Sequence, residues 1–96
     1  MVAYFIADQQ EVTDPETMKT YSAGVAATIE QYGGKFAVRG GDPEVLEGGW
    51  AVRRVIILEF KDRAALKAWY DSPEYADLLK MRLASSRSNA IIVDGA

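Results

Sequence analysis

The chain has 96 residues, with 11 Lys and Arg against 14 Asp and Glu, which gives a formal charge of −3 at pH 7. It contains no His and no Cys. This length allows one domain, which we place at residues 1–96. The two missing residue types exclude a disulfide, a His- or Cys-dependent nucleophile, and any zinc, copper, haem or iron–sulfur site held by these side chains. We therefore expect no metal and no cofactor.

Hydropathy and charge also limit the partners. The longest uninterrupted apolar run, Val55–Leu58, is far shorter than the roughly 20 residues of a membrane helix. The first residues lack the basic region of a signal peptide. The basic residues are interspersed with acidic ones, whereas nucleic-acid binding requires a basic face. We expect a cytoplasmic protein with no membrane and no nucleic acid among its partners.

Residues 2–10 predict a first strand, with Tyr4 and Ile6 on one face and Ala3, Phe5 and Ala7 on the other.

A helix is predicted over residues 15–32. It begins either with Asp14 as the cap and Pro15 in the first turn, or with Thr13 as the cap and Glu16 as its capping-box partner. Gly33 and Gly34 supply a C-terminal cap. One face of this helix is apolar and consists of Met18, Tyr21, Val25, Ile29 and Tyr32.

The middle of the chain alternates between extended segments and turns. Residues 35–39 predict a strand, residues 40–43 a bend, and residues 44–47 a short extended piece. Residues 52–60 predict a strand whose centre is apolar on both faces, so that both faces must be covered.

The last third predicts two helices and a strand. Asp62 caps a helix over residues 63–71, and the cap-and-proline pair Ser72-Pro73 begins a second helix that runs to about residue 87. On this second helix we expect Leu79 and Leu83 to lie in the core. Residues 89–94 predict the final strand.

The element order is βαββαβ, with the second helix split at Pro73. This order is typical of a ferredoxin-like α+β fold, in which a four-stranded antiparallel sheet has helices on one face. The strands at residues 2–7, 55–58 and 90–93 are apolar on both faces, and the uncovered face is too apolar to remain in water. We therefore predict a homodimer in which two sheets face each other, a dimeric α+β barrel.

Four segments resemble the domain-of-unknown-function family 1330: YGGKFAVRGG (32–41), RVIILEF (54–60), AWYDSPEY (68–75) and the ending IVDG (92–95). The resemblance covers essentially the whole chain. It implies membership of the dimeric α+β barrel superfamily, and it implies no reaction because the family is uncharacterised. The superfamily includes cofactor-free monooxygenases, isomerases, haem enzymes and ligand-sensing domains, and haem branches with a His ligand cannot apply here.

Two charged residues late in otherwise apolar strands, Arg39 and Glu59, are the first candidate site residues. In a functional interpretation, Arg39 binds a substrate carboxylate and Glu59 acts as orienting group or general base. The structural alternative is an ion pair within one chain or across the dimer, or simple exposure at a strand end.

The second constellation is aromatic and consists of Tyr4, Tyr21, Tyr32, Trp69, Tyr70 and Tyr75. Tyr4, Tyr21, Trp69 and Tyr75 can line a pocket, and a tyrosine hydroxyl can orient a ligand or donate a proton. The alternative is that these rings fill the core or the dimer interface.

Ser72 and Arg82 complete the candidates. Ser72 is a helix cap, and the free N–H groups beside it can also bind an anion. Arg82 lies seven residues beyond Tyr75 on the same helix face and either joins an anion site or offsets Glu74 or Asp77 at the surface.

The expected function is cofactor-independent acid–base or oxygen chemistry on a small organic acid or aromatic compound. Glu59 and Tyr75 would be catalytic. The ligand-binding residues would be Arg39, Tyr4, Tyr21, Trp69, Ser72 and Arg82. The alternative is a non-catalytic ligand-binding or assembly module.

Overall fold

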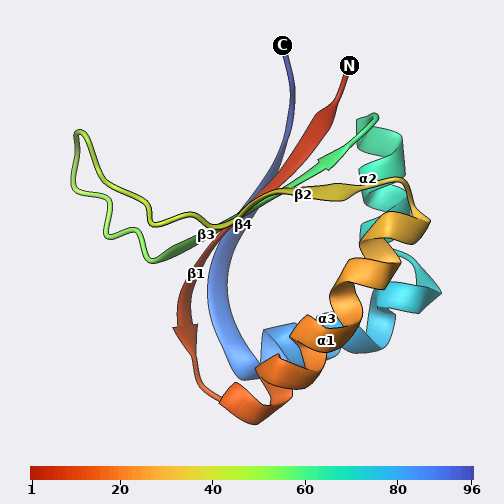
Figure 1. Cartoon of the computed structure of the whole chain (residues 1–96), viewed down its shortest axis with the longest axis horizontal. Coiled ribbons are helices and arrows are strands. Elements are labelled where there is room, and N and C mark those ends of the chain that lie inside the picture. The colour runs from red at the N-terminus through yellow and green to blue at the C-terminus, as the bar shows by residue number, and fades with distance from the viewer.

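Seven elements occur in the predicted order in a computed structural model that describes residues 1–96 (Figure 1). They are β1 (Ala3–Val12), α1 (Pro15–Gln31), β2 (Lys35–Gly40), β3 (Arg54–Phe60), α2 (Arg63–Tyr70), α3 (Pro73–Ser85) and β4 (Ser86–Asp94). None of the three helices is long and apolar enough to cross a membrane.

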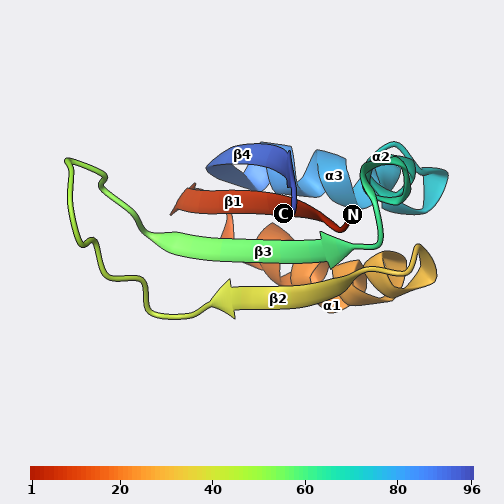
Figure 2. The ribbon, with the colours of Figure 1, turned by 90° about the horizontal axis from the view of Figure 1, so that it is seen from above.

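The strands form one antiparallel sheet in the order β2-β3-β1-β4 (Figure 2). All three helices lie on the same side of this sheet (Figures 1 and 2). The prediction of a ferredoxin-like α+β fold with a four-stranded antiparallel sheet is confirmed.

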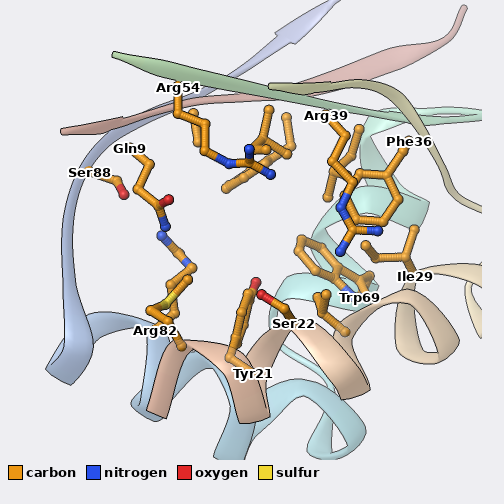
Figure 3. Close-up of a pocket in the computed structure, with 16 residues that line it drawn as sticks. Gln9, Tyr21, Ser22, Ile29, Phe36, Arg39, Arg54, Trp69, Arg82 and Ser88 are labelled. Carbon is orange, nitrogen blue, oxygen red and sulfur yellow. The ribbon is translucent and has the colours of Figure 1, made fainter. Parts of the chain in front are cut away.

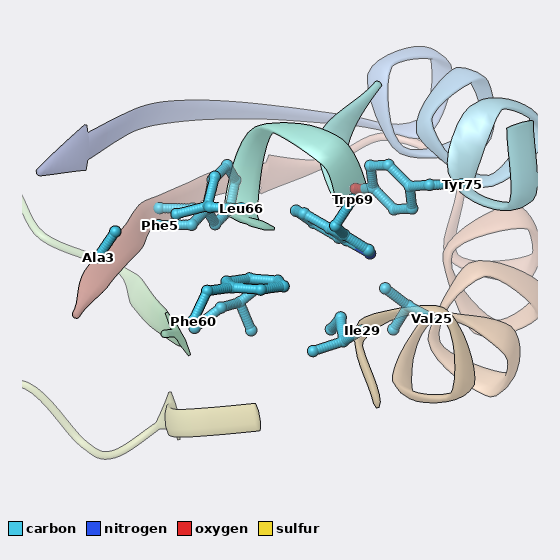
Figure 4. Close-up of a cluster of buried hydrophobic side chains, with 10 residues drawn as sticks. Ala3, Phe5, Val25, Ile29, Phe60, Leu66, Trp69 and Tyr75 are labelled. Atoms are coloured by element: carbon cyan, nitrogen blue, oxygen red, sulfur yellow. The ribbon is translucent and has the colours of Figure 1, made fainter. Parts of the chain in front are cut away.

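The core lies between the sheet and the helices and is centred on Trp69 of α2 (Figure 4). The Trp69 ring packs on Phe5, Phe60 and Tyr75, with centroid distances of 5.8, 5.6 and 4.2 Å. Its indole N–H donates to Thr28 Oγ1 of α1 over 3.1 Å. The polar atom of the largest buried side chain is therefore satisfied inside the core.

Helix starts follow the cap residues. Asp14, not Thr13, is the N-cap of α1, and its Oδ1 accepts from the backbone N–H of Thr17 over 3.2 Å. Asp62 caps α2 through a bond from Ala65 N. The backbone N–H of Thr13 instead donates to Ser85 O and joins the end of β1 to the end of α3.

Several boundaries differ from the prediction, and three of the differences are large enough to matter for the site or the core. Residues 44–47 form no strand, and β3 begins at Arg54 instead of residue 52. The helix α3 ends at Ser85, because residues 86–88 pair with the far end of β1, where Arg87 lies opposite Glu11. Leu83 is 63% exposed and is not a core residue. The buried face of α3 follows Tyr75, Leu78, Leu79, Arg82 and Ser85, and Leu83 lies outside it.

The two faces of β1 separate as predicted. Ala3, Phe5 and Ala7 are buried under the helices. Tyr4 and Ile6 lie on the opposite face, which we call the open face, because no helix covers it. Their partners there include Ile57 of β3 and, on β4, Ile91 and Val93, which are 61% and 39% exposed.

The segment from 41 to 53 is a long irregular loop that projects beyond the sheet (Figure 2). Its base is attached to Asp8 on the open face of β1. The Asp8 carboxylate accepts from Trp50 Nε1 (2.9 Å), Arg53 N (3.0 Å) and Arg54 N (3.3 Å), and also from Gln10 Nε2 (2.6 Å).

Candidate functional site

A cavity of about 90 Å³ lies between the sheet and α1 (Figure 3). Ten of its 16 lining residues are hydrophobic. Apolar walls come from β1, β2, β3, α1 and α2, and include Phe5, Phe36, Ile56, Ile29 and Trp69. The cavity therefore suits the apolar body of a small molecule.

Three arginines and no Asp or Glu line this cavity. Arg39 comes from β2, Arg54 from β3 and Arg82 from α3, and their side chains enter the cavity from its two sides (Figure 3). The ion pairs of the protein involve other cations: Lys35, Arg63 and Arg87. In a chain with a net charge of −3, this cavity concentrates uncompensated positive charge.

Arg82 is the most deeply placed of the three and is only 8% exposed. Its Nε donates to Tyr75 Oη over 3.3 Å, and its other polar neighbours are the phenols of Tyr21 and Tyr70. Burial alone would lower the pKa of Arg82, but these hydroxyls outweigh it and raise the pKa. Arg82 is therefore a charged side chain held in the interior by neutral groups only.

The hydroxyls of Tyr21 and Tyr75 lie 2.8 Å apart, and either of them can donate the hydrogen bond that joins them. Tyr75 is completely buried, and its hydroxyl also accepts from Arg82 Nε. Arg82, Tyr75 and Tyr21 therefore form one chain of hydrogen bonds. Tyr21 lines the cavity and brings a phenol hydroxyl to the end of this chain.

Tyr21 is a neutral donor at any physiological pH. Burial, together with the adjacent Tyr75, raises the pKa of its hydroxyl far above the usual range. The inner end of the cavity thus presents an O–H group and a guanidinium, both of which donate to an anion.

Four of the predicted site residues, Arg39, Tyr21, Trp69 and Arg82, line the cavity together. Tyr75 lies directly behind Tyr21 and does not reach the cavity itself.

Glu59, Tyr4 and Ser72 lie elsewhere. Glu59 and Tyr4 are opposite each other on the open face, where Glu59 pairs with Lys35 Nζ at 3.5 Å. Ser72 is the N-cap of α3 and accepts from Tyr75 N over 3.1 Å. The predicted grouping of Arg39 with Glu59 is not formed.

A bulge in β2 separates Arg39 from Glu59. Lys35 of β2 pairs with Glu59 and lies on the open face. If side chains alternated regularly along β2, Arg39 would lie on this face too, four residues after Lys35. The register shifts between Phe36 and Val38, so that Arg39 pairs with Ile56 on the helix-covered face. The same shift brings the Arg39 guanidinium over the Phe36 ring, with Cζ 4.4 Å from the centroid.

Sequence reasoning missed Arg54 as a site residue. The signal was present, because Arg54 precedes Ile56 and Leu58 at two-residue spacing and so shares their face of β3. All three residues line the cavity.

The fold and this cavity define a ferredoxin-like α+β domain with an apolar pocket that carries three arginines. The family model of the domain of unknown function DUF1330 matches residues 2–96, and the chain belongs to this family. A comparison with curated proteins finds no significant match.

Solved structures share the fold. RPA0582 from Rhodopseudomonas palustris, a protein of unknown function, has a TM-score of 0.79 at 20% identity over 99% of this chain and 82% of its own. A dimeric ferredoxin-like protein of unknown function from Jannaschia sp. CCS1 has a TM-score of 0.74 at 15% identity, over 99% and 100%. SnoaB from Streptomyces nogalater, a cofactor-independent oxygenase, has a TM-score of 0.65 at 17% identity, over 99% and 92%.

Proposed function

We propose that the protein binds a small organic acid with an apolar or aromatic body in the cavity between α1 and the sheet. The observation that carries this proposal is Arg82, a nearly buried guanidinium that lines the cavity and has only neutral phenols as partners. A buried cation without a counter-charge is costly, and a bound carboxylate removes this cost.

The remaining walls support the same ligand class. Phe36, Ile56 and Trp69 provide apolar surface for the body of the ligand, and Tyr21 adds a neutral donor beside Arg82. Glu59, Tyr4 and Ser72 have no part in this proposal because they lie outside the cavity.

A thermal-shift screen of the purified protein against small aliphatic and aromatic carboxylates tests the proposal. We expect several of them to raise the melting temperature and Arg82→Gln to abolish the shift, because this variant removes the buried charge. The matched control is Arg87→Gln, on the exposed end of β4. The proposal fails if carboxylates stabilise the Arg82→Gln variant as much as the unsubstituted protein.

We also propose that two copies of the chain pair through their open faces. Ile57, Ile91 and Val93 leave too much apolar surface in water for a stable single sheet. The Jannaschia structure, which is described as dimeric, has the same fold and supports this arrangement. Light scattering at micromolar concentration tests it, and a uniform monomer would contradict it.

A second candidate is catalysis in the same cavity, as cofactor-independent acid–base or oxygen chemistry on the bound acid. It is favoured by the chain of hydrogen bonds from Arg82 through Tyr75 to Tyr21, which can stabilise a developing oxyanion. Oxygen consumption and turnover of the acids that bind in the thermal-shift screen test it. Bound acids that are recovered unchanged in air would leave ligand binding as the function.

A further inference from the structure

The mouth of the cavity carries a second cationic site, separate from Arg82. Arg39 and Arg54 lie on the same face of neighbouring strands and are both exposed. Their side chains are close to one segment of β2, since a Cβ on Gly40 would lie 3.0 Å from Arg54 Nη1. Both guanidiniums point from the sheet toward the helices (Figure 3).

Neither of these two arginines has a carboxylate partner. Each ion pair of the protein uses a different cation, and the only interaction found for the Arg39 guanidinium is with the Phe36 ring. A single anionic group at Arg82 would therefore leave two uncompensated positive charges at the mouth. Two guanidiniums at the mouth of one cavity repel each other, and an anion bound near both removes this repulsion.

The inner end has its own complete set of donors. The Tyr21 hydroxyl and the Arg82 guanidinium both line the cavity, and the guanidinium has five N–H donors of which Nε–H binds Tyr75. Between the inner end and the mouth, the lining is mainly apolar, with Phe5, Ile56 and Leu58 on the sheet side.

We infer that the ligand is a dianion with an apolar body, one anionic group binding Arg82 and Tyr21 at the inner end and the second binding Arg39 and Arg54 at the mouth. This inference rests on the proposed function and names the ligand class for the same cavity.

Isothermal titration calorimetry with four probes tests the inference. Adipate is compared with monomethyl adipate, and terephthalate with monomethyl terephthalate, so that each pair differs by one charge at nearly constant length. We expect each diacid to bind at least about tenfold more tightly than its monoester, because the second carboxylate gains charge-assisted hydrogen bonds.

Variants show which residues cause the preference for diacids, those at the mouth or those at the inner end of the cavity. The double variant Arg39→Gln/Arg54→Gln should reduce the ratio to about twofold or less, while Tyr21→Phe should weaken diacid and monoester equally. The matched control is Arg53→Gln, an exposed arginine adjacent to Arg54 that does not line the cavity, which should leave the ratio unchanged. Arg39 and Arg54 are exposed, so their replacement does not endanger folding.

The outcomes separate the two proposals. Equal binding of diacids and monoesters, with both weakened by Tyr21→Phe, would overturn the dianion and leave the anion pocket intact. A diacid preference that survives the double variant would also overturn the assignment to Arg39 and Arg54. Failure of all four probes to bind at millimolar concentration would overturn both proposals.

Discussion

The indole Nε1 of Trp50 donates a hydrogen bond to Asp8 Oδ2 over 2.9 Å, which joins the loop between β2 and β3 to the middle of β1. The other oxygen of Asp8 accepts the backbone N–H groups of Arg53 and Arg54. Asp8 therefore sets the point at which β3 begins, and with it the position of Arg54 at the mouth of the cavity.

Asp8→Asn tests this role. The amide keeps one oxygen for the two backbone donors, but its NH₂ group then faces the N–H of Trp50 and the amide of Gln10, so that donors oppose donors. We expect a loss of about 1–3 kcal/mol in the free energy of unfolding, measured by urea denaturation. Trp50 emission should also shift to longer wavelength. Asp77→Asn, at an exposed position of α3, is the control, and equal stability of the two variants would contradict the assignment.

The same carboxylate predicts a pH dependence. Burial alone would raise the pKa of Asp8, but the hydrogen bonds from the Arg53 backbone, Trp50, Gln10 and the Arg54 backbone lower it below the ordinary value. A carboxyl group whose pKa is lower in the folded than in the unfolded state stabilises the folded state. This contribution is complete above the unfolded-state pKa of about 4 and is lost as the pH falls through the pKa of the folded state. The Trp50 emission should therefore change in the acid range below pH 4. In Asp8→Asn this transition should be missing, and its persistence there would assign it to another carboxyl.

The packing around Gly34 leaves no room for a side chain at this position. A Cβ there would lie 2.5 Å from Phe60 Cε1 and 2.9 Å from Ile29 Cγ2. Both neighbours are 1% exposed and cannot move aside. Gly34→Ala should lower the free energy of unfolding by about 1–3 kcal/mol in urea denaturation. Gly49→Ala, which meets nothing within 4 Å, should be close to neutral, and similar losses in both variants would contradict a packing cause.

The fold could be predicted because its signals are local. Asp62 and Ser72 each cap a helix at the residue expected from the sequence, and Asp14 is one of the two caps expected for α1. The alternation in β1 correctly separates Ala3 and Phe5 from Tyr4. The boundaries that were wrong depend on pairing between distant strands. Arg87 is in β4, because β1 continues far enough to pair with it.

The site could be predicted only in part because its three arginines lie on three separate elements, β2, β3 and α3. Arg39 and Arg82 are candidate site residues from the sequence and both line the cavity, but the bulge in β2 has no clear sequence signal and moves Arg39 away from Glu59. Arg54 was missed because its strand was interpreted only as core. The burial of Arg82 beside Tyr75 and Tyr21 depends on the packing of α3 against α1, which periodicity on a single helix does not show.

Ile57→Glu tests the pairing of two open faces. Ile57 lies at the centre of β3, where it is paired with Ile6 and Val38, and its side chain points away from the helices. In the proposed dimer a carboxylate there would be buried without a partner, so the variant should be monomeric by light scattering while its circular dichroism is unchanged. Leu83→Glu introduces the same charge at an exposed position of α3 and should remain dimeric. An Ile57→Glu variant that still forms dimers would show that the chains associate through another surface.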